Sequence, residues 1–472
     1  MDGADGTGMS GGDPGRPGAS RREVLKGLAA VAAAPLVASG PAARALAGAG
    51  AAAVLREPGS LPFPGRPAGT DMIPRIEHIV VLMMENHSYD NKLGMLGRPG
   101  ADGFTLGADG KPAETNPYPG GTKVQHAFRM PTTCQDSGSP SQTWKASHTA
   151  YHGGRNDGFV AASGAVAMGY WERADQPFYY SLASTFPIAD RYFCSVLGQT
   201  FPNRRYLMAG TSLGMVNDDQ VWDLPGYPKN GTIFDQLNKH GISWKNYWSS
   251  TPTTLLFPKL FTRDPANSLR LAKIGHFFAD AAAGKLPGFC IVEPDFGDTS
   301  EEDPQNVAAG EQFAARVVNA VMAGPKWGST LLIWTYDEHG GYYDHVPPPP
   351  AVPPDDIAPT GFLGGPRYDG FGRYGFRVPC AVVSPWARPG YVSHNVFDHT
   401  SILKLVETKW NLPALTRRDA NANNMLDMLD FSRPAFAKPP VLAKPLVAVD
   451  SAALACDTTG PGTIPPPGSV TG

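Results

Sequence analysis

The sequence predicts an α/β fold built on a mostly parallel central sheet, with long loop insertions between its elements. Continuous apolar runs of about six residues, each stopping at polar residues, are typical of strands buried on both faces. Segments with a helical pattern lie between these runs, and such alternation favours an active site at the carboxyl ends of the strands. The 54 glycines and 47 prolines among 472 residues indicate many loops. The expected strands are residues 79–84, 331–336 and 378–383, and the expected helices are residues 232–240, 268–283, 311–322 and 401–410.

Composition and charge exclude several classes of protein. Charged residues make up 18% of the chain and hydrophobic ones 42%, which fits neither a disordered chain nor a coiled coil. The 40 basic and 43 acidic residues give a net charge of −3 without a basic stripe, so nucleic acid is not an expected partner. Without an internal repeat, the simplest organisation is one catalytic domain over residues 73–456, followed by a disordered tail over 457–472.

The first 47 residues have the pattern of a twin-arginine signal peptide. Arg21 and Arg22 precede a short apolar run and a small-x-small site at residues 45–47. That run is too short to cross about 30 Å of hydrocarbon. We therefore expect passage through the twin-arginine export machinery to the periplasm or the medium, with residues 48–72 as a linker. The five cysteines lie beyond the signal and allow at most two disulfides, whose pairing stays open: Cys134, Cys194, Cys290, Cys380 and Cys456.

Two of the expected strands end in adjacent acidic or amide residues. Glu85 and Asn86 follow one run, and Asp337 and Glu338 follow another. Side chains at the carboxyl edge of a parallel sheet converge, and carboxylate and amide oxygens suit a hard divalent cation. Helix caps or loop carboxylates are the alternative. The sequence predicts one or more divalent metal ions here, with calcium, magnesium, manganese and zinc all left open.

A nucleophile candidate lies in the segment 195–206. Pro202 suits the first turn of a helix, which leaves Thr200 just ahead of the helix N-terminus. Free backbone N–H groups and the helix dipole favour a phosphate there, and a hydroxyl beside a metal can become a nucleophile. Asn203 and Arg204 could then bind phosphoryl oxygens. The alternative is an ordinary helix cap.

Four ordered blocks, residues 76–90, 200–204, 335–348 and 398–403, resemble the bacterial phosphoesterase family. That family holds phosphatidylcholine-type phospholipases C and an acid phosphatase, and is related in fold to alkaline phosphatase. The resemblance runs from about residue 73 to 412 and implies an alkaline-phosphatase-like three-layer sandwich. It implies that Glu85, Asn86, Asp337 and Glu338 bind the metal.

The same resemblance implies that Thr200 is the nucleophile, as in the phospholipase C members, whereas the phosphatase branch carries serine. Residues 144–159 also resemble the family, which makes His148 an active-site histidine. Two departures stand out, because Gln142 and the segment 301–304 occupy places where the family commonly has histidines. Asp303, or Glu302 beside it, would have to serve as the acid, and near neutral pH that requires a raised pKa.

Other polar residues of these blocks have less specific roles. His339 and His345 are either metal-site residues or supports of the glycine turn between them. Asp398, Thr400 and Ser401 form a helix-cap cluster. His87 is expected to be structural or to face solvent.

Together these features predict an exported, metal-dependent phosphoesterase. The main hypothesis is a phospholipase C that hydrolyses phospholipid head groups through a phosphothreonine. The alternatives are a phosphomonoesterase of acid-phosphatase type, acting on small phosphate esters, and an exported binding protein without turnover. Contact with a membrane surface stays open.

Overall fold

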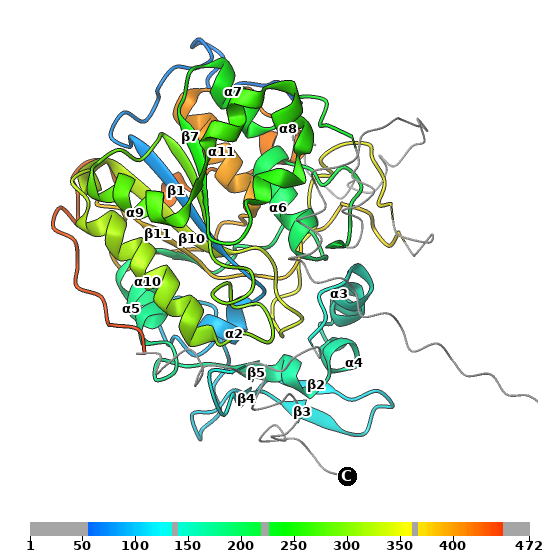
Figure 1. Ribbon diagram of the computed structural model, residues 1–472. Coiled ribbons are helices and arrows are strands. Elements are labelled where there is room, and N and C mark those ends of the chain that lie inside the picture. Colours follow the sequence, from blue (N-terminus) through cyan, green and yellow to red (C-terminus); the bar gives the residue numbers. More distant parts are fainter. Residues whose placement is uncertain (1–54, 135–139, 219–225, 361–366, 447–472) are drawn as a thin grey trace, which may run out of the picture.

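The computed structural model describes residues 55–134, 140–218, 226–360 and 367–446. Its centre is an eight-stranded sheet in the order β12-β6-β11-β10-β1-β9-β7-β8, with helices on both faces (Figure 1). The predicted α/β class is confirmed. The strands of this sheet are β1 (His78–Met84), β6 (Ile188–Ala189), β7 (Trp244–Trp248), β8 (Leu271–Lys273), β9 (Phe289–Glu293), β10 (Thr330–Tyr336), β11 (Cys380–Val383) and β12 (Val392–Ser393).

The middle of the sheet is parallel and fully buried. β1 pairs in parallel with β10 on one side and with β9 on the other. Every residue of β1 and β10 is buried, as expected of continuous apolar strands covered on both faces. Met84 lies opposite Tyr336 in the register, so the segments that follow β1 and β10 leave the sheet side by side.

The third expected strand differs from the prediction in direction. It begins at Cys380 rather than at residue 378, and it runs antiparallel to β10. Its carboxyl end therefore lies at the edge opposite to the ends of β1 and β10. An apolar run reports burial on both faces and carries no information about strand direction.

Helices cover the sheet on two sides. α10 contacts β1, β10, α5 and α9, whereas α11 contacts α6 and α12 (Figure 1). The buried aliphatic and aromatic side chains of both layers form one large core around the sheet. The helices of these layers are α5 (Pro177–Thr185), α6 (Thr200–Ala209), α7 (Ile233–Lys239), α8 (Pro258–Arg263), α9 (Ile274–Ala282), α10 (Val307–Ala323), α11 (His399–Trp410) and α12 (Arg417–Ala420), with short 3-10 turns η4 (Thr253–Leu256), η5 (Pro265–Arg270), η6 (Trp327–Ser329) and η8 (Leu426–Met428).

Each of the four expected helices has a counterpart, with corrected bounds. The helix expected over 268–283 begins only at Ile274, because residues 271–273 pair with β7 as strand β8. The one expected over 311–322 begins earlier, at Val307, where the Asn306 side chain caps its first turn. The other two become α7 and α11. Asp398 and Ser401 form a capping box at the start of α11, as the sequence predicts.

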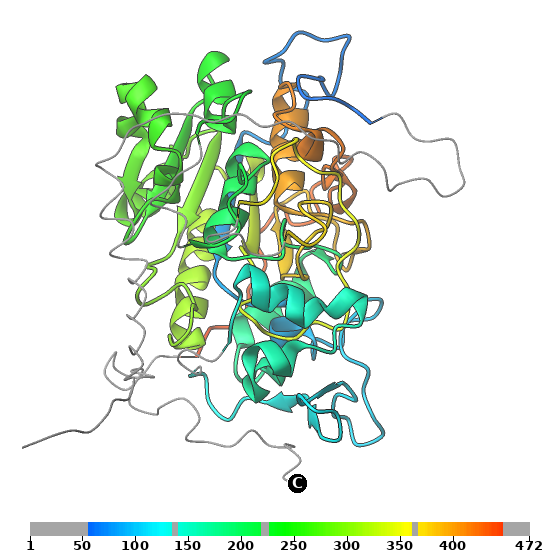
Figure 2. The same ribbon diagram turned by 90° about the vertical axis from the view of Figure 1, so that its right-hand side faces the viewer.

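A smaller region lies beyond the carboxyl ends of β1 and β10 (Figures 1 and 2). It follows β1 in the chain and returns to the sheet before β6. Its elements are α2 (Tyr89–Leu93), β2 (Thr115–Pro117), β3 (Val124–His126), β4 (Phe128–Arg129), α3 (Trp144–Tyr151), η1 (His152–Gly154), α4 (Phe159–Ser163), η2 (Ala165–Met168) and β5 (Gly169–Tyr170).

Part of the segment expected to be a linker instead packs on the domain. The backbone N–H of Gly59 donates to Ala414 O at 2.7 Å, and that of Met72 donates to Lys409 O at 2.7 Å. The Asn411 side chain at the end of α11 donates to Phe63 O at 3.0 Å. Gly/Ala/Pro-rich composition did not reveal these backbone contacts. The expected signal peptide, the tail over 457–472 and the expected domain end at Cys456 lie outside the described residues.

Two further features concern membrane-spanning helices and the cysteines. Among the described helices, none has both the length and the apolar composition needed to cross a bilayer. Cys134 is disulfide-bonded, whereas Cys194, Cys290 and Cys380 are buried free thiols. Three of the four cysteines that the structure describes are therefore free thiols.

Candidate active site

The ends of β1 and β10 are joined directly by hydrogen bonds. The backbone N–H of Asn86 donates to Asp337 Oδ1 at 3.1 Å, and that of Asp337 donates to Met84 O at 3.2 Å. Glu85, Asn86, Asp337 and Glu338 are all buried. The structure therefore brings the four predicted metal ligands together at one edge of the sheet, as their position after parallel strands predicts.

A glycine turn closes on this edge. Gly340 has φ +66°, and a Cβ placed on it would lie 1.8 Å from Asn86 O. Its N–H donates to Glu338 Oε2 at 2.8 Å. Asn86 itself has a left-handed backbone, with φ 68°. Only glycine fits where these two segments of the chain approach so closely, and this contact fixes Asn86 beside Glu338.

Thr200 lies at the same edge. It is the first residue of α6, it is buried, and its hydroxyl donates to Asn86 Oδ1 at 3.2 Å. The predicted nucleophile thus contacts a predicted metal ligand, although the two are 114 residues apart in the chain.

The helix N-terminus is less open to an anion than the sequence suggested. The backbone N–H of Phe201 donates to Asp218 Oδ1 at 2.7 Å, and Pro202 has no N–H. Asp218 in turn donates its own N–H to Gln199 Oε1 at 3.0 Å. A carboxylate of the protein therefore takes a donor that the sequence had assigned to a phosphate.

Asn203 and Arg204 are also directed at the protein. The Asn203 amide accepts from Val196 N at 3.0 Å and donates to Gly198 O and Gln199 O, each at 3.0 Å. Because these bonds use both ends of the amide, Asn203 holds the loop before Thr200. The phosphoryl contact of Asn203 stays a prediction, and these loop bonds are the contacts that its amide makes.

The Arg204 guanidinium lies behind the strand ends. It donates from Nε to Asp337 Oδ2 at 3.0 Å and from one terminal nitrogen to Met84 O at 3.3 Å. The same nitrogen lies 3.8 Å from Glu85 Oε1. Burial disfavours the charge of Arg204, but the carboxylates of Asp337, Glu85 and Glu293 outweigh it and raise its pKa. Arg204 is 1% exposed and lies among carboxylates, and its contact with a phosphoryl group stays a prediction.

A third strand end carries a carboxylate that the sequence analysis missed. Glu293 is the last residue of β9 and is fully buried. Its Oε1 lies 3.5 Å from the second terminal nitrogen of Arg204. The run over 289–293 is apolar and ends in glutamate, which is the signal that could have revealed it.

His148 lies elsewhere in the site region. Its Nδ1 donates to Trp144 O at 2.7 Å, and its ring stacks on Tyr368 at 3.8 Å. Its Nε2 lies 3.7 Å from Asp369 Oδ1. In the part of the chain that the structure describes, these contacts connect His148 to Trp144 and to residues 368–369 rather than to Thr200.

The segment that carries Gln142 is fixed between both halves of the site. A Cβ on Gly341 would lie 2.5 Å from Ser141 N. On the other side, Trp144 N donates to Asn217 Oδ1 at 2.8 Å, next to the Asp218 that caps the Thr200 helix. The position where the family has a histidine therefore lies in a loop that bridges the glycine turn and the nucleophile segment.

Asp303 lies in a loop that contacts the end of β1. The Tyr342 hydroxyl donates to Asp303 Oδ1 at 3.2 Å, and Glu85 N donates to Ser300 O at 2.9 Å. This loop is anchored by a fully buried ion pair that the sequence analysis missed, between Lys92 Nζ and Glu301 Oε2 at 2.5 Å. Asp303 itself contacts Tyr342, and its role as an acid stays a prediction.

Three further histidines of the four sequence blocks, His399, His339 and His345, have different surroundings. His399 Nε2 donates to Asp337 O at 2.7 Å, and its Nδ1 accepts from Tyr192 at 3.1 Å. Burial lowers the pKa of His339 to about 3, which leaves a neutral ring packed on Phe376. His345 pairs with Asp90 at 2.7 Å, a support rather than a ligand.

His87 is fully buried and donates to Glu301 O at 3.0 Å. Of the two alternatives left open for it, the structural one is confirmed and exposure to solvent is wrong.

The donor chemistry of the strand ends fits a divalent cation. Carboxylates of Glu85, Glu293 and Asp337 surround the single guanidinium of Arg204, and ionised carboxylates in excess of their buried counter-charges are costly. In the described ranges, no three His, Cys, Asp or Glu side chains form a closed metal-binding group. Asp337 Oδ1 instead accepts from Asn86 N and Glu338 N. The residues fit a hard cation by chemistry and charge, and their side chains face protein donors.

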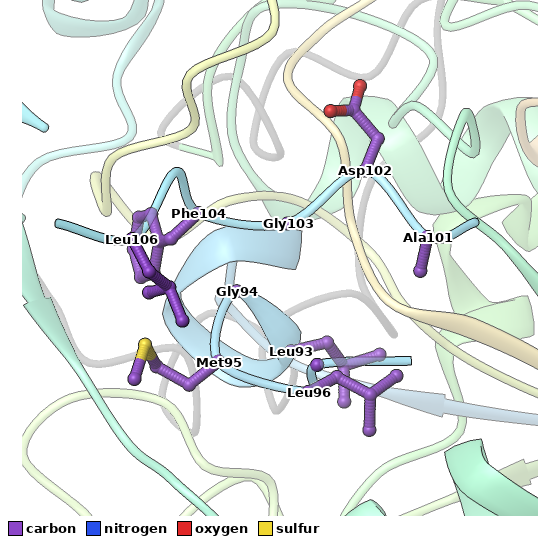
Figure 3. Close-up of a pocket in the computed structure, with 10 residues that line it drawn as sticks. Leu93, Gly94, Met95, Leu96, Ala101, Asp102, Gly103, Phe104 and Leu106 are labelled. Carbon is purple, nitrogen blue, oxygen red and sulfur yellow. The ribbon is translucent and has the colours of Figure 1, made fainter. Parts of the chain in front are cut away.

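A small cavity lies apart from these residues. It has a volume of about 130 Å³ and lies around the turn that follows α2, with Met95, Phe104 and Leu106 among its side chains (Figure 3). Its lining, residues 93–97, 101–104 and 106, contains none of the predicted site residues. The cavity therefore does not mark the candidate site.

Comparison with known proteins adds independent information. Residues 76–413 match the Phosphoesterase family. The chain is 34% identical over 376 residues to Non-specific phospholipase C1 of Arabidopsis thaliana, covering 73% of this chain and 69% of the relative. It is 32% identical over 470 residues to Phospholipase C A of Mycobacterium tuberculosis, covering 85% and 87%. A solved protein of the alkaline phosphatase superfamily from Vibrio parahaemolyticus aligns over 76% of this chain and 71% of its own, at 10% identity and a TM-score of 0.38.

Proposed function

The chain belongs to the phosphoesterase family and is a phosphoric ester hydrolase, and from this premise we propose that it is an exported, metal-dependent phospholipase C with Thr200 as its nucleophile. The observation that carries the proposal is the hydrogen bond from the Thr200 hydroxyl to Asn86, at the edge where Glu85, Asp337 and Glu338 meet. The relatives named phospholipase C support the diester substrate.

Glu85, Asn86, Asp337 and Glu338 would hold the metal. When bound, a divalent cation supplies charge that stabilises a phosphoryl oxygen and favours the ionised form of a nearby alcohol. Asn86 orients the Thr200 oxygen through the hydrogen bond of 3.2 Å. The Asp218 cap and the Asn203 loop bonds fix the turn from which Thr200 projects.

The proposed reaction consists of two successive displacements at phosphorus. The Thr200 oxygen loses its proton to solvent and attacks phosphorus, and the bond from phosphorus to the diacylglycerol oxygen breaks. The leaving oxygen takes a proton from an acid of the site, for which Asp303 is the candidate. A water molecule then attacks the phosphothreonine, releases the phosphorylated head group and restores the Thr200 hydroxyl.

Because Gln142 and the segment 301–304 lack the histidines that the family commonly has there, the proton for the leaving oxygen has to come from another side chain. The Gln142 amide can donate a hydrogen bond but cannot protonate a leaving group near neutral pH. A carboxyl at Asp303 that acts as an acid needs a raised pKa, so activity should be highest on the acidic side of neutrality.

The test uses the purified mature protein with added divalent metal. It measures phosphocholine and inorganic phosphate released from phosphatidylcholine vesicles and from a soluble aryl phosphate. Release of phosphocholine without inorganic phosphate supports the proposal. Inorganic phosphate from the aryl ester alone would instead establish a phosphomonoesterase, and no release from either substrate would favour a binding protein without turnover.

Export is a separate part of the proposal, supported by Arg21, Arg22 and the small-x-small site near Ala47. Sequencing the N-terminus of the exported protein tests it. We expect cleavage close to Ala47, and substitution of both arginines by lysine should retain the precursor in the cell.

A further inference from the structure

Glu293 occupies an unusual position for a glutamate. It is fully buried at the end of β9, next to β1 in the sheet. Its Oε2 accepts from Asn246 Nδ2 at 3.0 Å and from Thr253 N at 2.9 Å. Its Oε1 accepts from the Thr253 hydroxyl and lies 3.5 Å from Arg204. Uncharged donors thus fix the carboxylate, and Arg204 is the cation that it faces.

We propose that Glu293 is a positioning residue that sets the orientation of the Arg204 guanidinium and, through it, the carboxylates of Asp337 and Glu85. The inference rests on the proposed function of this edge of the sheet. It adds a residue outside the four predicted ligands and outside the nucleophile segment.

The geometry of Arg204 gives the reason. Its nitrogens face three adjacent strands: Nε faces Asp337 after β10, one terminal nitrogen faces Met84 O on β1, and the other faces Glu293 on β9. A guanidinium is a rigid planar fork, so fixing one nitrogen fixes the directions of the other two. Phe296 covers the guanidinium, with its ring centre 5.0 Å from the central carbon.

The charge of Glu293 distinguishes positioning from simple packing. With Glu293 ionised, the charge of Arg204 is shared between Glu293 and the strand-end carboxylates. Without that charge, Arg204 is balanced by Asp337 and Glu85 alone and competes more strongly for the oxygens that would bind a metal. Glu293 therefore leaves those oxygens available.

The primary variant is E293Q, which keeps size and an acceptor for Thr253 but removes the charge. We expect kcat on phosphatidylcholine vesicles to fall by about 10- to 100-fold with KM within about twofold, as for other outer partners of metal ligands. E293D, which retains the charge, should recover part of the loss. Affinity for Mg²⁺, Ca²⁺, Mn²⁺ and Zn²⁺, measured by calorimetry on the metal-free protein, should fall in E293Q.

A second variant tests whether the effect passes through Arg204. E293Q is also introduced into the R204K variant, in which the rigid fork is already lost. There the loss of kcat caused by E293Q should be less than about a quarter of the loss that E293Q causes in the wild type. E311Q is the matched control. Burial raises the pKa of Glu311 to about 8, so the buried glutamine resembles the protonated side chain already present at neutral pH.

The crystal structure of E293Q gives a readout that does not depend on activity or on bound metal. We expect the Arg204 guanidinium to turn away from residue 293 toward Asp337 and Glu85. An unmoved guanidinium, full kcat, or an equal effect of E293Q in the R204K background would overturn the inference. A wild type that releases no product from any ester would contradict the proposed function instead, and the position of Arg204 would still decide the role of Glu293.

Discussion

The Thr200 hydroxyl donates a hydrogen bond to the Asn86 side-chain oxygen across 3.2 Å. This contact joins the N-terminus of α6 to the end of β1. The two segments are far apart in the sequence and are brought together by the fold. Asn86 is held in turn by Asp337 and by the close approach of Gly340. The nucleophile candidate is therefore fixed to the part of the sheet that carries the carboxylates.

Thr200→Ala should abolish turnover while leaving the fold intact. Removal of a nucleophile typically costs at least about 1,000-fold in kcat, since only binding and electrostatic stabilisation remain. Thr200→Ser keeps a hydroxyl and should retain measurable activity. Rates on phosphatidylcholine vesicles and thermal unfolding of each variant check this. An alanine variant that keeps a tenth of the wild-type rate would remove Thr200 from the mechanism.

Gly340→Ala should damage both stability and activity. The new methyl group would meet Asn86 O at 1.8 Å, in a backbone conformation with φ +66°. Left-handed strain alone costs about 1–3 kcal/mol, and the backbone clash adds to it. Gly59→Ala is the matched control, because Gly59 has φ +85° and nothing lies within 4 Å of its added Cβ. Denaturant unfolding should show a clearly larger loss for Gly340; equal losses would argue against the close contact.

His345 should make stability depend on pH. Burial disfavours its imidazolium, but the Asp90 carboxylate outweighs that effect and raises the pKa of His345 to about 9. A pKa raised in the folded state stabilises fully below the unfolded value near 6.5, and this stabilisation is lost as the pH rises through about 9. The contribution of this pKa shift to the free energy of unfolding is at most about 3 kcal/mol.

His345→Gln tests that dependence. The difference in unfolding free energy between wild type and variant should be large at pH 6 and much smaller at pH 10. The other charged groups beside His345 are Asp102, Asp344 and Arg377, and they are present in both proteins. A difference independent of pH would show that His345 is not protonated in the folded protein.

Metal removal should abolish activity and lower stability together. A ligand at about 100 times its Kd stabilises the folded state by about 2.7 kcal/mol. Chelation should therefore lower Tm, and adding back a divalent ion should restore both Tm and turnover. In Glu338→Gln the added ion should raise Tm less. Unchanged activity after complete chelation, verified by elemental analysis, would contradict metal dependence.

The sequence predicted the strand-end part of the site because its signals are local. Glu85-Asn86 and Asp337-Glu338 stop two unbroken apolar runs, and parallel pairing then places them together. Thr200 was found from Pro202 and the start of a helix. Such patterns need no knowledge of distant contacts.

What the sequence did not predict depends on contacts between distant segments. Lys92 and Glu301 pair across 209 residues, and neither lies in a pattern that indicates burial. The direction of β11 and the change from helix to strand at residues 271–273 depend on neighbouring strands. Asn203 and Arg204 were identified as polar groups near the nucleophile, but only the fold shows that they face the loop and the carboxylates.

The central claim is a covalent intermediate on Thr200, and the stereochemistry at phosphorus tests it most directly. A phosphatidylcholine analogue made chiral at phosphorus with sulfur is hydrolysed in water enriched in ¹⁸O, and the configuration of the released phosphorothioate is determined. Each in-line displacement inverts phosphorus, so attack by Thr200 followed by water predicts overall retention. Inversion would show a single direct attack by water and would contradict the account.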